Sequence, residues 1–383
     1  MHPRGVENPR IYWAGTKILT IRRYTMHMEV SVLDFRSIIE SAFRLVSIGI
    51  VAAAMSHSIA LGAVQGDLLE DETNRIVKSE TCYQGEWGSE AAYLARPQTK
   101  KAYEDAAQRE RAKQRYAIWR ERYDCRWIKY PVDDLLVDGF IVVPTGTPPE
   151  NGWPVVIFNH GGNADIGEVR FQYIAMRLSP LVDAGFAVMG SQYRGTRVSG
   201  VENPDRLRDE FGGADVADVL SLIDIAEDLS AIDQDNIGMW GTRRGGMMAF
   251  LAARQDDRIS ALVAEATPVD LIELRERRPD MEQVYKTWIP DYETNPDYAL
   301  EERSVIYWAD ELPESTSILI LHGSEDQRVD PNQAARLART LATLRRDFKM
   351  VLYEGDAHGI RKNHRAMITE IPAWFARSLM KTH

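Results

Sequence analysis

The residues that most constrain the chemistry of this chain lie at 236–248, which read Asn-Ile-Gly-Met-Trp-Gly-Thr-Arg-Arg-Gly-Gly-Met-Met. A short apolar strand leads there into a Gly-x-x-x-Gly turn and then into a helix-forming run. This pattern is typical of a nucleophile elbow, Gly-x-Ser-x-Gly, in which a sharp strand-to-helix turn exposes a serine. Gly241 and Gly245 occupy the glycine positions, but Arg243 stands where the serine belongs. A guanidinium stays protonated and has no acceptor lone pair, so it cannot attack a carbonyl.

Two later loops carry an acid and a histidine. Asp326 follows the apolar run 317–321, and His358 follows the run 349–353. A lone aspartate in a loop is usually a turn former, and a lone histidine after a strand is usually structural. Together with the elbow they follow the order nucleophile, acid, base of α/β-hydrolases. The order and the placement therefore favour a catalytic origin for these loops.

Thr242 carries the hydroxyl nearest to the lost serine. An elbow projects one side chain, so we expect this hydroxyl to face the sheet or a helix instead of a substrate. Removing the serine of a comparable triad lowers kcat by about 10⁶, which corresponds to about 8 kcal/mol of transition-state stabilisation. The sequence therefore predicts a site that is inactive or strongly impaired.

Apolar runs of strand length alternate with helical patterns from residue 127 onward. The predicted strands are 140–144, 155–158, 186–189, 237–240, 261–264, 317–321 and 349–353, and the predicted helices are 215–229, 249–254, 332–345 and 364–380. This alternation predicts an α/β fold with a mostly parallel, doubly wound sheet covered on both faces. Functional residues of such sheets gather at the carboxyl ends of the strands.

Residues 128–380 resemble the catalytic domain of the prolyl oligopeptidase family of serine peptidases. The matching stretches are Asp138-Gly-Phe, Asn159-His-Gly-Gly162, Gln192-Tyr-Arg-Gly195, Phe211-Gly-Gly-Ala-Asp-Val216, Ile237-Gly-Met, Arg244-Gly-Gly-Met-Met, Leu321-His-Gly with Asp326 and Val329, and Glu354-Gly with His358-Gly. The resemblance implies an α/β-hydrolase fold with a small helical cap insertion. The propeller of larger family members has no counterpart in the chain.

The resemblance also implies roles for individual residues. Asp326 would be the triad acid and His358 the base. The backbone N–H of Arg244 would be one oxyanion donor, and the loop at His160, Gly161 and Gly162 would supply the other. No cofactor and no metal are implied.

Two interpretations of Arg243 remain open. One is simple loss of the serine. The other is a new use, in which Arg243 pairs with Asp326, since a buried arginine needs such a partner, or binds a ligand carboxylate. Three functions follow: a pseudoenzyme that keeps a pocket for peptide-like or ester-like ligands, an active serine-type peptidase or esterase of which this sequence is a variant, and an anion-binding or peptide-binding scaffold.

The first 63 residues differ in composition from the rest. Arg44 precedes the apolar run 45–55, and small residues follow up to residue 63. This pattern predicts a secretory signal peptide that starts at Met26 or Met28, and hence an exported protein. The alternatives are a membrane anchor that extends to Val64 and a buried helix. We expect a helical segment at 64–127, with a helix over 101–122, and the hydrolase domain at 128–383.

The remaining composition excludes some functions. The formal net charge of −11 argues against nucleic acid as a partner. The only two cysteines, Cys82 and Cys125, form a plausible disulfide in an exported protein; two buried thiols are the alternative.

The stretch 270–312 holds six aromatic residues that would form either a pocket wall or the packing of a cap, namely Tyr285, Trp288, Tyr292, Tyr298, Tyr307 and Trp308.

Overall fold

A computed structural model describes residues 73–102, 105–162, 166–195 and 209–380. The chain divides into two units, 1–65 and 66–383. The expected leader at 44–63 and the alternative starts Met26 and Met28 lie outside the described residues. Within the described ranges, none of the helices combines the length and the apolar character that crossing a bilayer requires.

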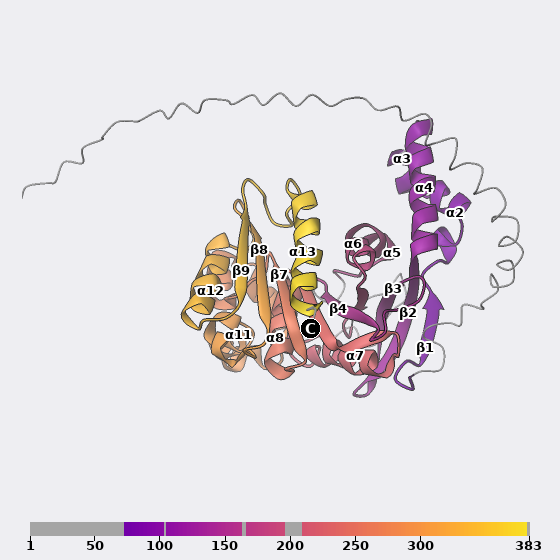
Figure 1. Ribbon diagram of the computed structural model, residues 1–383. Helices are drawn as coiled ribbons and strands as arrows, with labels where there is room; N and C mark the ends of the chain where they lie inside the picture. The colour runs from indigo at the N-terminus through magenta and orange to yellow at the C-terminus, as the bar shows by residue number, and fades with distance from the viewer. Residues whose placement is uncertain (1–72, 103–104, 163–165, 196–208, 381–383) are drawn as a thin grey trace, which may run out of the picture. The chain divides into compact units, whose positions relative to one another are not determined.

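Nine strands form one sheet in the order β1-β2-β3-β5-β4-β6-β7-β8-β9. Their bounds are β1 Lys78–Thr81, β2 Tyr123–Val132, β3 Leu135–Pro144, β4 Trp153–Asn159, β5 Ala187–Ser191, β6 Ile232–Thr242, β7 Ile259–Glu265, β8 Ser317–Gly323 and β9 Phe348–Tyr353. All pairings from β5 through β4 to β9 are parallel, whereas β1, β2 and β3 pair antiparallel at one edge. The sheet is therefore mostly parallel, as the α/β pattern predicts (Figure 1).

The central strands are buried on both faces, which explains their continuous apolar runs. In β4, Val155 and Ile157 belong to one hydrophobic core, and Val156 and Phe158 belong to a second core. Successive side chains of a strand point to opposite faces, so the two cores lie on the two sides of the sheet.

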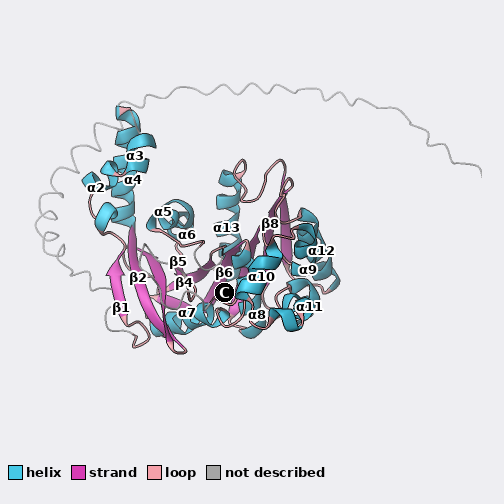
Figure 2. Ribbon diagram, turned by 180° about the vertical axis from the view of Figure 1, so that it is seen from behind, coloured by secondary structure: helices cyan, strands magenta, loops and turns pink. Residues whose placement is uncertain are grey.

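Helices cover both faces (Figures 1 and 2). Residues of α7, α8 and α12 belong to the first core, and residues of α5, α6 and α13 belong to the second. The bounds of these helices are α5 Phe171–Tyr173, α6 Ser179–Asp183, α7 Val216–Asp228, α8 Arg244–Gln255, α12 Pro331–Thr343 and α13 His364–Leu379. A π-helical segment, η2, covers Ile174–Leu178 between α5 and α6.

The segment before the sheet's centre contains η1 Gly85–Trp87, α2 Glu90–Ala95, α3 Pro97–Ala102 and α4 Ala106–Arg122. The expected boundary between residues 127 and 128 falls inside β2, and β1 pairs with that strand. A disulfide joins Cys82 to Cys125 with a Cα–Cα distance of 5.3 Å. This segment thus contributes two strands and a crosslink to the sheet as well as helices.

The stretch 270–312 forms short helices, with bounds α9 Leu271–Arg277, α10 Met281–Trp288, η4 Tyr292–Thr294, α11 Pro296–Glu301, η5 Val305–Tyr307 and η6 Ala309–Glu311. Tyr285, Tyr292 and Trp308 are buried in the first core, whereas Tyr298 and Tyr307 are exposed. Trp288 packs against the same core. The aromatic residues therefore serve mainly to pack the cap against the domain.

Candidate functional site

The turn between β6 and α8 has the geometry of a nucleophile elbow. Arg243, between the two elements, has φ 57° and ψ −121°, a region that is strained for any residue with a side chain. The backbones approach closely here: a methyl group on Gly245 would lie 2.0 Å from the Asn159 carbonyl oxygen, and one on Gly241 would lie 2.2 Å from the Gly245 oxygen. Only glycine fits at these two positions, because a side chain there would overlap the neighbouring backbone. The fold thus forms the strained turn with an arginine at residue 243.

The side chain of Arg243 extends across the site. A methyl group built on Gly161 would lie 3.1 Å from the Cβ of Arg243, and one on Gly359 would lie 3.2 Å from its Nη2. The side chain therefore runs from the loop beside His160 to the loop that carries His358. Arg243 is exposed, and no described residue forms an ion pair with it. The expectation of a buried Arg243 paired with Asp326 is wrong, because other groups already hold that carboxylate.

Asp326 and His358 lie within hydrogen-bond distance. His358 Nδ1 is 2.8 Å from Asp326 Oδ2, and His322 Nε2 lies 3.2 Å from the same oxygen. The backbone N–H groups of Arg328 and Val329 donate to Asp326 Oδ1. Burial alone raises the pKa of the Asp326 carboxyl, but the hydrogen bonds from His322 and His358 outweigh it and hold that pKa well below its usual range. The carboxylate is thus charged and fixed, and it orients the ring of His358.

The two expected oxyanion elements flank the elbow. Arg244 is the first residue of α8, so its N–H has no acceptor inside the helix. Gly161 lines the same cavity as Arg243. The His160 ring is buried, with Nδ1 2.8 Å from the Gly161 oxygen and Nε2 3.2 Å from the Gln192 oxygen. The histidine side chain therefore holds the loop in place beside the cavity, which both His160 and Gly161 line.

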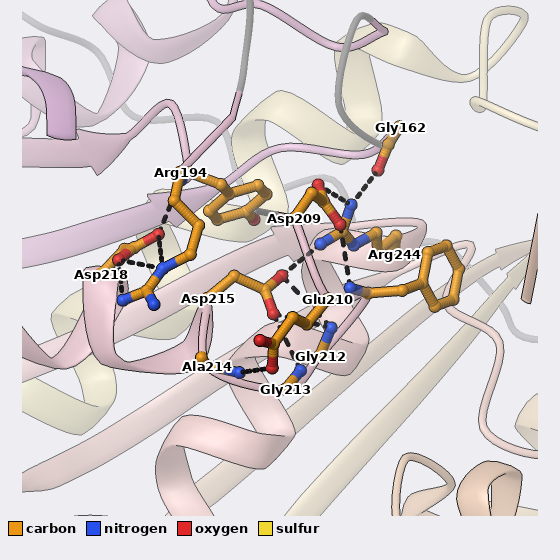
Figure 3. Close-up of polar contacts among 12 residues, drawn as sticks. Gly162, Arg194, Asp209, Glu210, Gly212, Gly213, Ala214, Asp215, Asp218 and Arg244 are labelled. Carbon is orange, nitrogen blue, oxygen red and sulfur yellow. Dashed lines mark hydrogen bonds and ion pairs between the residues drawn. The ribbon is translucent and has the colours of Figure 1, made fainter. Parts of the chain in front are cut away.

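The side chain of Arg244 enters a buried ionic cluster (Figure 3), and Arg244 is not among the residues that line the cavity beside Arg243. It donates from Nη1 to Asp209 at 2.8 Å, from Nη1 to the Gly162 carbonyl at 3.0 Å, and from Nη2 to Asp215. The guanidinium also lies over the ring of Phe211, 4.8 Å from its centroid. These contacts tie the loop at residues 209–215 and the loop at residues 160–162 to the start of α8.

A cavity of about 530 Å³ opens beside Arg243, a volume within the range of small-ligand sites. Its polar lining residues from the helices and strands beneath the turn are Tyr173, Arg177, Thr242, Glu265 and His364. Thr242 is buried and lies near Tyr173 of α5, and burial raises the pKa of that tyrosine to about 12. Thr242 is therefore a buried neighbour of a helix residue, whereas Arg243 at the apex of the turn is exposed.

A larger hollow of about 850 Å³ lies among Trp153, Asp233, Ser317 and Asp347. These residues are at or beside the beginnings of strands, whereas Arg243 and Asp326 follow the ends of strands. Since sites of parallel sheets form at the carboxyl ends, the 530 Å³ cavity is the candidate site. The described residues contain no group of three or more His, Cys, Asp or Glu side chains suited to a metal.

Five residues around the site were not singled out from the sequence. These are His322, the Asp209–Asp215 pair beneath Arg244, and the Arg177–Glu265 ion pair in the cavity wall. Glu265 offered a signal, because it is an acid directly after the apolar run 261–264. His322 precedes Asp326 by four residues. The partners of Arg244 and of Arg177 lie 29 to 88 residues away in the chain, so only the folded chain brings those together.

Comparisons with known proteins identify the family and the fold. The profile of the prolyl oligopeptidase family matches residues 172–382. The uncharacterized peptidase YuxL of Bacillus subtilis is 26% identical over 261 residues, which cover 66% of this chain and 39% of that protein. The uncharacterized peptidase YtmA of the same organism is 24% identical, with 64% of this chain and 91% of that protein covered.

Solved structures show the same fold. A puromycin-hydrolyzing peptidase of Mycobacterium tuberculosis superposes with a TM-score of 0.56 at 25% identity, covering 66% of this chain and 39% of that one. An acylaminoacyl peptidase of Pyrococcus horikoshii has a TM-score of 0.59 at 21% identity, covering 70% and 44% of the two chains. The match with YuxL spans only 39% of that protein's length. With its elbow, its Asp326–His358 pair and its α/β-hydrolase sheet, the chain belongs to the prolyl oligopeptidase family.

Proposed function

We propose that this chain is a hydrolase domain without its nucleophile, which binds peptide-like or ester-like ligands and hydrolyses them extremely slowly. The observation that carries the proposal is Arg243 at the apex of an otherwise intact elbow. A guanidinium has no lone pair for attack. Its side chain also crosses from Gly161 toward Gly359, through the space between the oxyanion loop and the histidine loop.

The retained acid and base support binding, or weak chemistry, at the old site. His358 is oriented by Asp326 and can accept a proton from a water molecule. Triads that lose their serine keep about 10³–10⁴ of catalysis over water through binding and the oxyanion hole, while kcat falls by about 10⁶. We expect residual hydrolysis in that range, lowered further where Arg243 blocks the approach of a carbonyl.

The test is labelling by a fluorophosphonate probe, which modifies activated serines. We expect the unmodified protein to stay unlabelled and Arg243→Ser to be labelled. The serine variant should also hydrolyse an activated ester several orders of magnitude faster; the strained turn and the 2.8 Å contact between His358 Nδ1 and Asp326 Oδ2 support this expectation. Arg243→Ala is the matched control, since it removes the guanidinium without adding a hydroxyl, and it should remain unlabelled.

Labelling of the unmodified protein at the site would contradict the proposal and require another nucleophile. If the unmodified protein and Arg243→Ser both stay unlabelled, the site differs from a working triad in more than residue 243. Hydrolysis by Arg243→Ser alone would also favour the view that this sequence is a variant of an active serine hydrolase.

A second candidate function is anion binding at Arg243. The guanidinium is exposed and forms no ion pair with a described residue, and it sits at the N-terminus of α8, where the helix dipole favours negative charge. A ligand carboxylate would satisfy both features. Binding of N-acetylglycine, measured by calorimetry, should be lost in Arg243→Ala; retention of the same affinity would remove this candidate.

A further inference from the structure

The wall of the candidate cavity contains a buried ion pair that the triad does not use. Glu265 is the last residue of β7, and its side chain is 3% exposed. Arg177 lies in the π-helical segment η2, and its side chain is 17% exposed. Single π-helical turns within a helix frequently occur at functional sites. Both side chains line the cavity beside Arg243.

The guanidinium of Arg177 is held on several sides. Its Nη2 donates to Glu265 Oε1, and its Nη1 lies 3.5 Å from His364 Nδ1. The Trp240 ring lies beneath it, 5.5 Å from ring centroid to guanidinium carbon. Burial and the charge of Arg177 lower the pKa of His364, so its neutral ring can accept this hydrogen bond. The ion pair is therefore positioned in advance and does not need a ligand to order it.

Each partner of this pair keeps one unused atom. Arg177 Nε and Glu265 Oε2 are both buried and have no hydrogen-bond partner among the described residues. Nε and Nη2 lie on the same edge of the guanidinium and can together bind both oxygens of a carboxylate. Here Nη2 bonds to Glu265 Oε1, whereas Nε and Oε2 do not bond to each other. Leaving a buried donor and a buried acceptor unpaired is unfavourable. A group that enters the cavity can satisfy both atoms.

The chemistry of the two open atoms limits the ligand group. Because the ion pair is neutral as a whole, a charged group placed between its two open atoms gains no net attraction from the pair itself. The group must also accept a hydrogen bond from Nε and donate one to Oε2. A primary carboxamide offers a carbonyl oxygen and an NH₂ on the same carbon and meets both conditions.

We infer that the cavity binds the primary carboxamide of a glutamine or asparagine side chain in a peptide-like ligand. The amide oxygen accepts from Arg177 Nε, and the amide NH₂ donates to Glu265 Oε2. This inference rests on the proposed function, because it assigns a side-chain preference to the ligand bound at the same site. Thr242 and Arg243 line the same cavity, which places the carboxamide next to the elbow.

The experiment compares peptides acetyl-Ala-X-Ala N-methylamide in which X is Gln, Asn, Leu, Glu, Lys or Ser. The caps carry no primary amide, so X supplies the only one. Binding to the full chain and to Arg243→Ala is measured by calorimetry, because Arg243 itself competes for space. We expect the Gln or Asn peptide to bind at least tenfold more tightly than the Leu, Glu and Lys peptides.

Glu265→Gln sharpens the test. It removes the negative charge beside Arg177 and leaves that cation without its partner, so the preference should invert, with the Glu peptide binding more tightly than the Gln peptide. Glu370→Gln is the matched control, because Glu370 pairs with Lys349 on the exposed side of α13; its peptide preferences should equal those of the unmodified protein. If Glu265→Gln does not fold, the peptide ranking on the unmodified protein still decides the question.

The outcomes separate this inference from the proposed function. Peptide binding without a preference for Gln or Asn would overturn only the inference, and would mean that the open atoms bind water or close upon each other. A preference for Ser would also overturn it, in favour of a hydroxyl ligand. If no peptide binds to either protein, the retained pocket of the proposed function is refuted as well, independently of how Arg243→Ser responds to the fluorophosphonate.

Discussion

Arg243 and Arg244 are consecutive in the chain, yet they face opposite sides of the elbow. Arg244 is 4% exposed and has two aspartates, Asp209 and Asp215, as partners. Arg243 is exposed, lies along the cavity and forms no ion pair with a described residue. One arginine belongs to the framework beneath the turn, and the other stands at the apex of the turn beside the cavity.

The difference shows that the framework of this turn does not depend on the side chain at its apex. The turn takes its shape from the close contact of β6, α8 and the loop at Asn159, and from the ionic cluster under Arg244. Residue 243 contributes a strained backbone and a side chain that points outward. A change of side chain there can therefore remove chemistry while the fold remains.

The largest expected effect on stability comes from Arg244→Ala. The substitution removes the cation that pairs with the buried carboxylates of Asp209 and Asp215, and breaking such a pair costs about 3–5 kcal/mol. Arg243→Ala should change the free energy of unfolding by about 1 kcal/mol or less, because the side chain is exposed. Urea unfolding of both variants measures the contrast.

Arg244→Lys provides the control for charge, because it keeps the cation but not the forked geometry; we expect a loss between those of the other two variants. Equal losses for Arg243→Ala and Arg244→Ala would contradict the division into framework and reacting group.

A smaller effect is expected from pH, through His160. This residue belongs to the framework, because its ring stacks on Tyr193, which in turn lies under Arg244. Burial lowers the pKa of His160 below its usual 6.5. Below pH 6.5 the unfolded chain therefore binds a proton that the folded chain does not, and stability falls by up to about 1.4 kcal/mol per pH unit for this group.

The measurement is the free energy of unfolding at pH 7.5, 6.5, 5.5 and 5.0 for the protein and for His160→Gln. The variant should show a shallower decrease below pH 6.5. Asp326 contributes in a different window, since its lowered pKa gives stability that is lost only as the pH falls below about 3.8. Identical slopes for the two proteins would show that His160 is not held neutral by the framework.

The smallest expected effect comes from Arg243→Gly. Glycine adopts the φ of 57° and ψ of −121° without the strain of a side chain, although it also gains entropy in the unfolded state. The relief of strain should outweigh this entropy, so Arg243→Gly should be more stable than the unmodified protein by about 1 kcal/mol. Thermal unfolding of Arg243→Gly against Arg243→Ala measures the strain alone, because both variants lack the guanidinium. A glycine variant less stable than the alanine variant would show that the turn relaxes around residue 243.

The sequence predicted the fold well because its signals were local. The apolar runs 155–158, 237–240 and 317–321 lie within β4, β6 and β8, since strands buried on both faces must be apolar throughout. The antiparallel edge was harder, because β1 and the first half of β2 lie in a polar segment whose composition favours helices. The helix expected over 101–122 is divided between α3 and α4.

Prediction of the site was uneven for a physical reason. Asp326 and His358 could be found from their places after strands and from their order in the chain. The partner of Arg243 was predicted wrongly, because spacing in the sequence does not show that Asp326 already accepts hydrogen bonds from His322, His358 and two backbone N–H groups.

By itself, the sequence determined the α/β sheet, the elbow, and the absence of a serine at residue 243, because these depend on residue types and on short-range patterns. The tertiary structure alone decided which charges meet. It turned Arg244 inward to Asp209 and Asp215 and left Arg243 along the cavity. It also placed Arg177 beside Glu265, which is 88 residues away in the chain. Ion pairs and cavities depend on distances between remote segments, and those distances exist only once the sheet and its helices have packed.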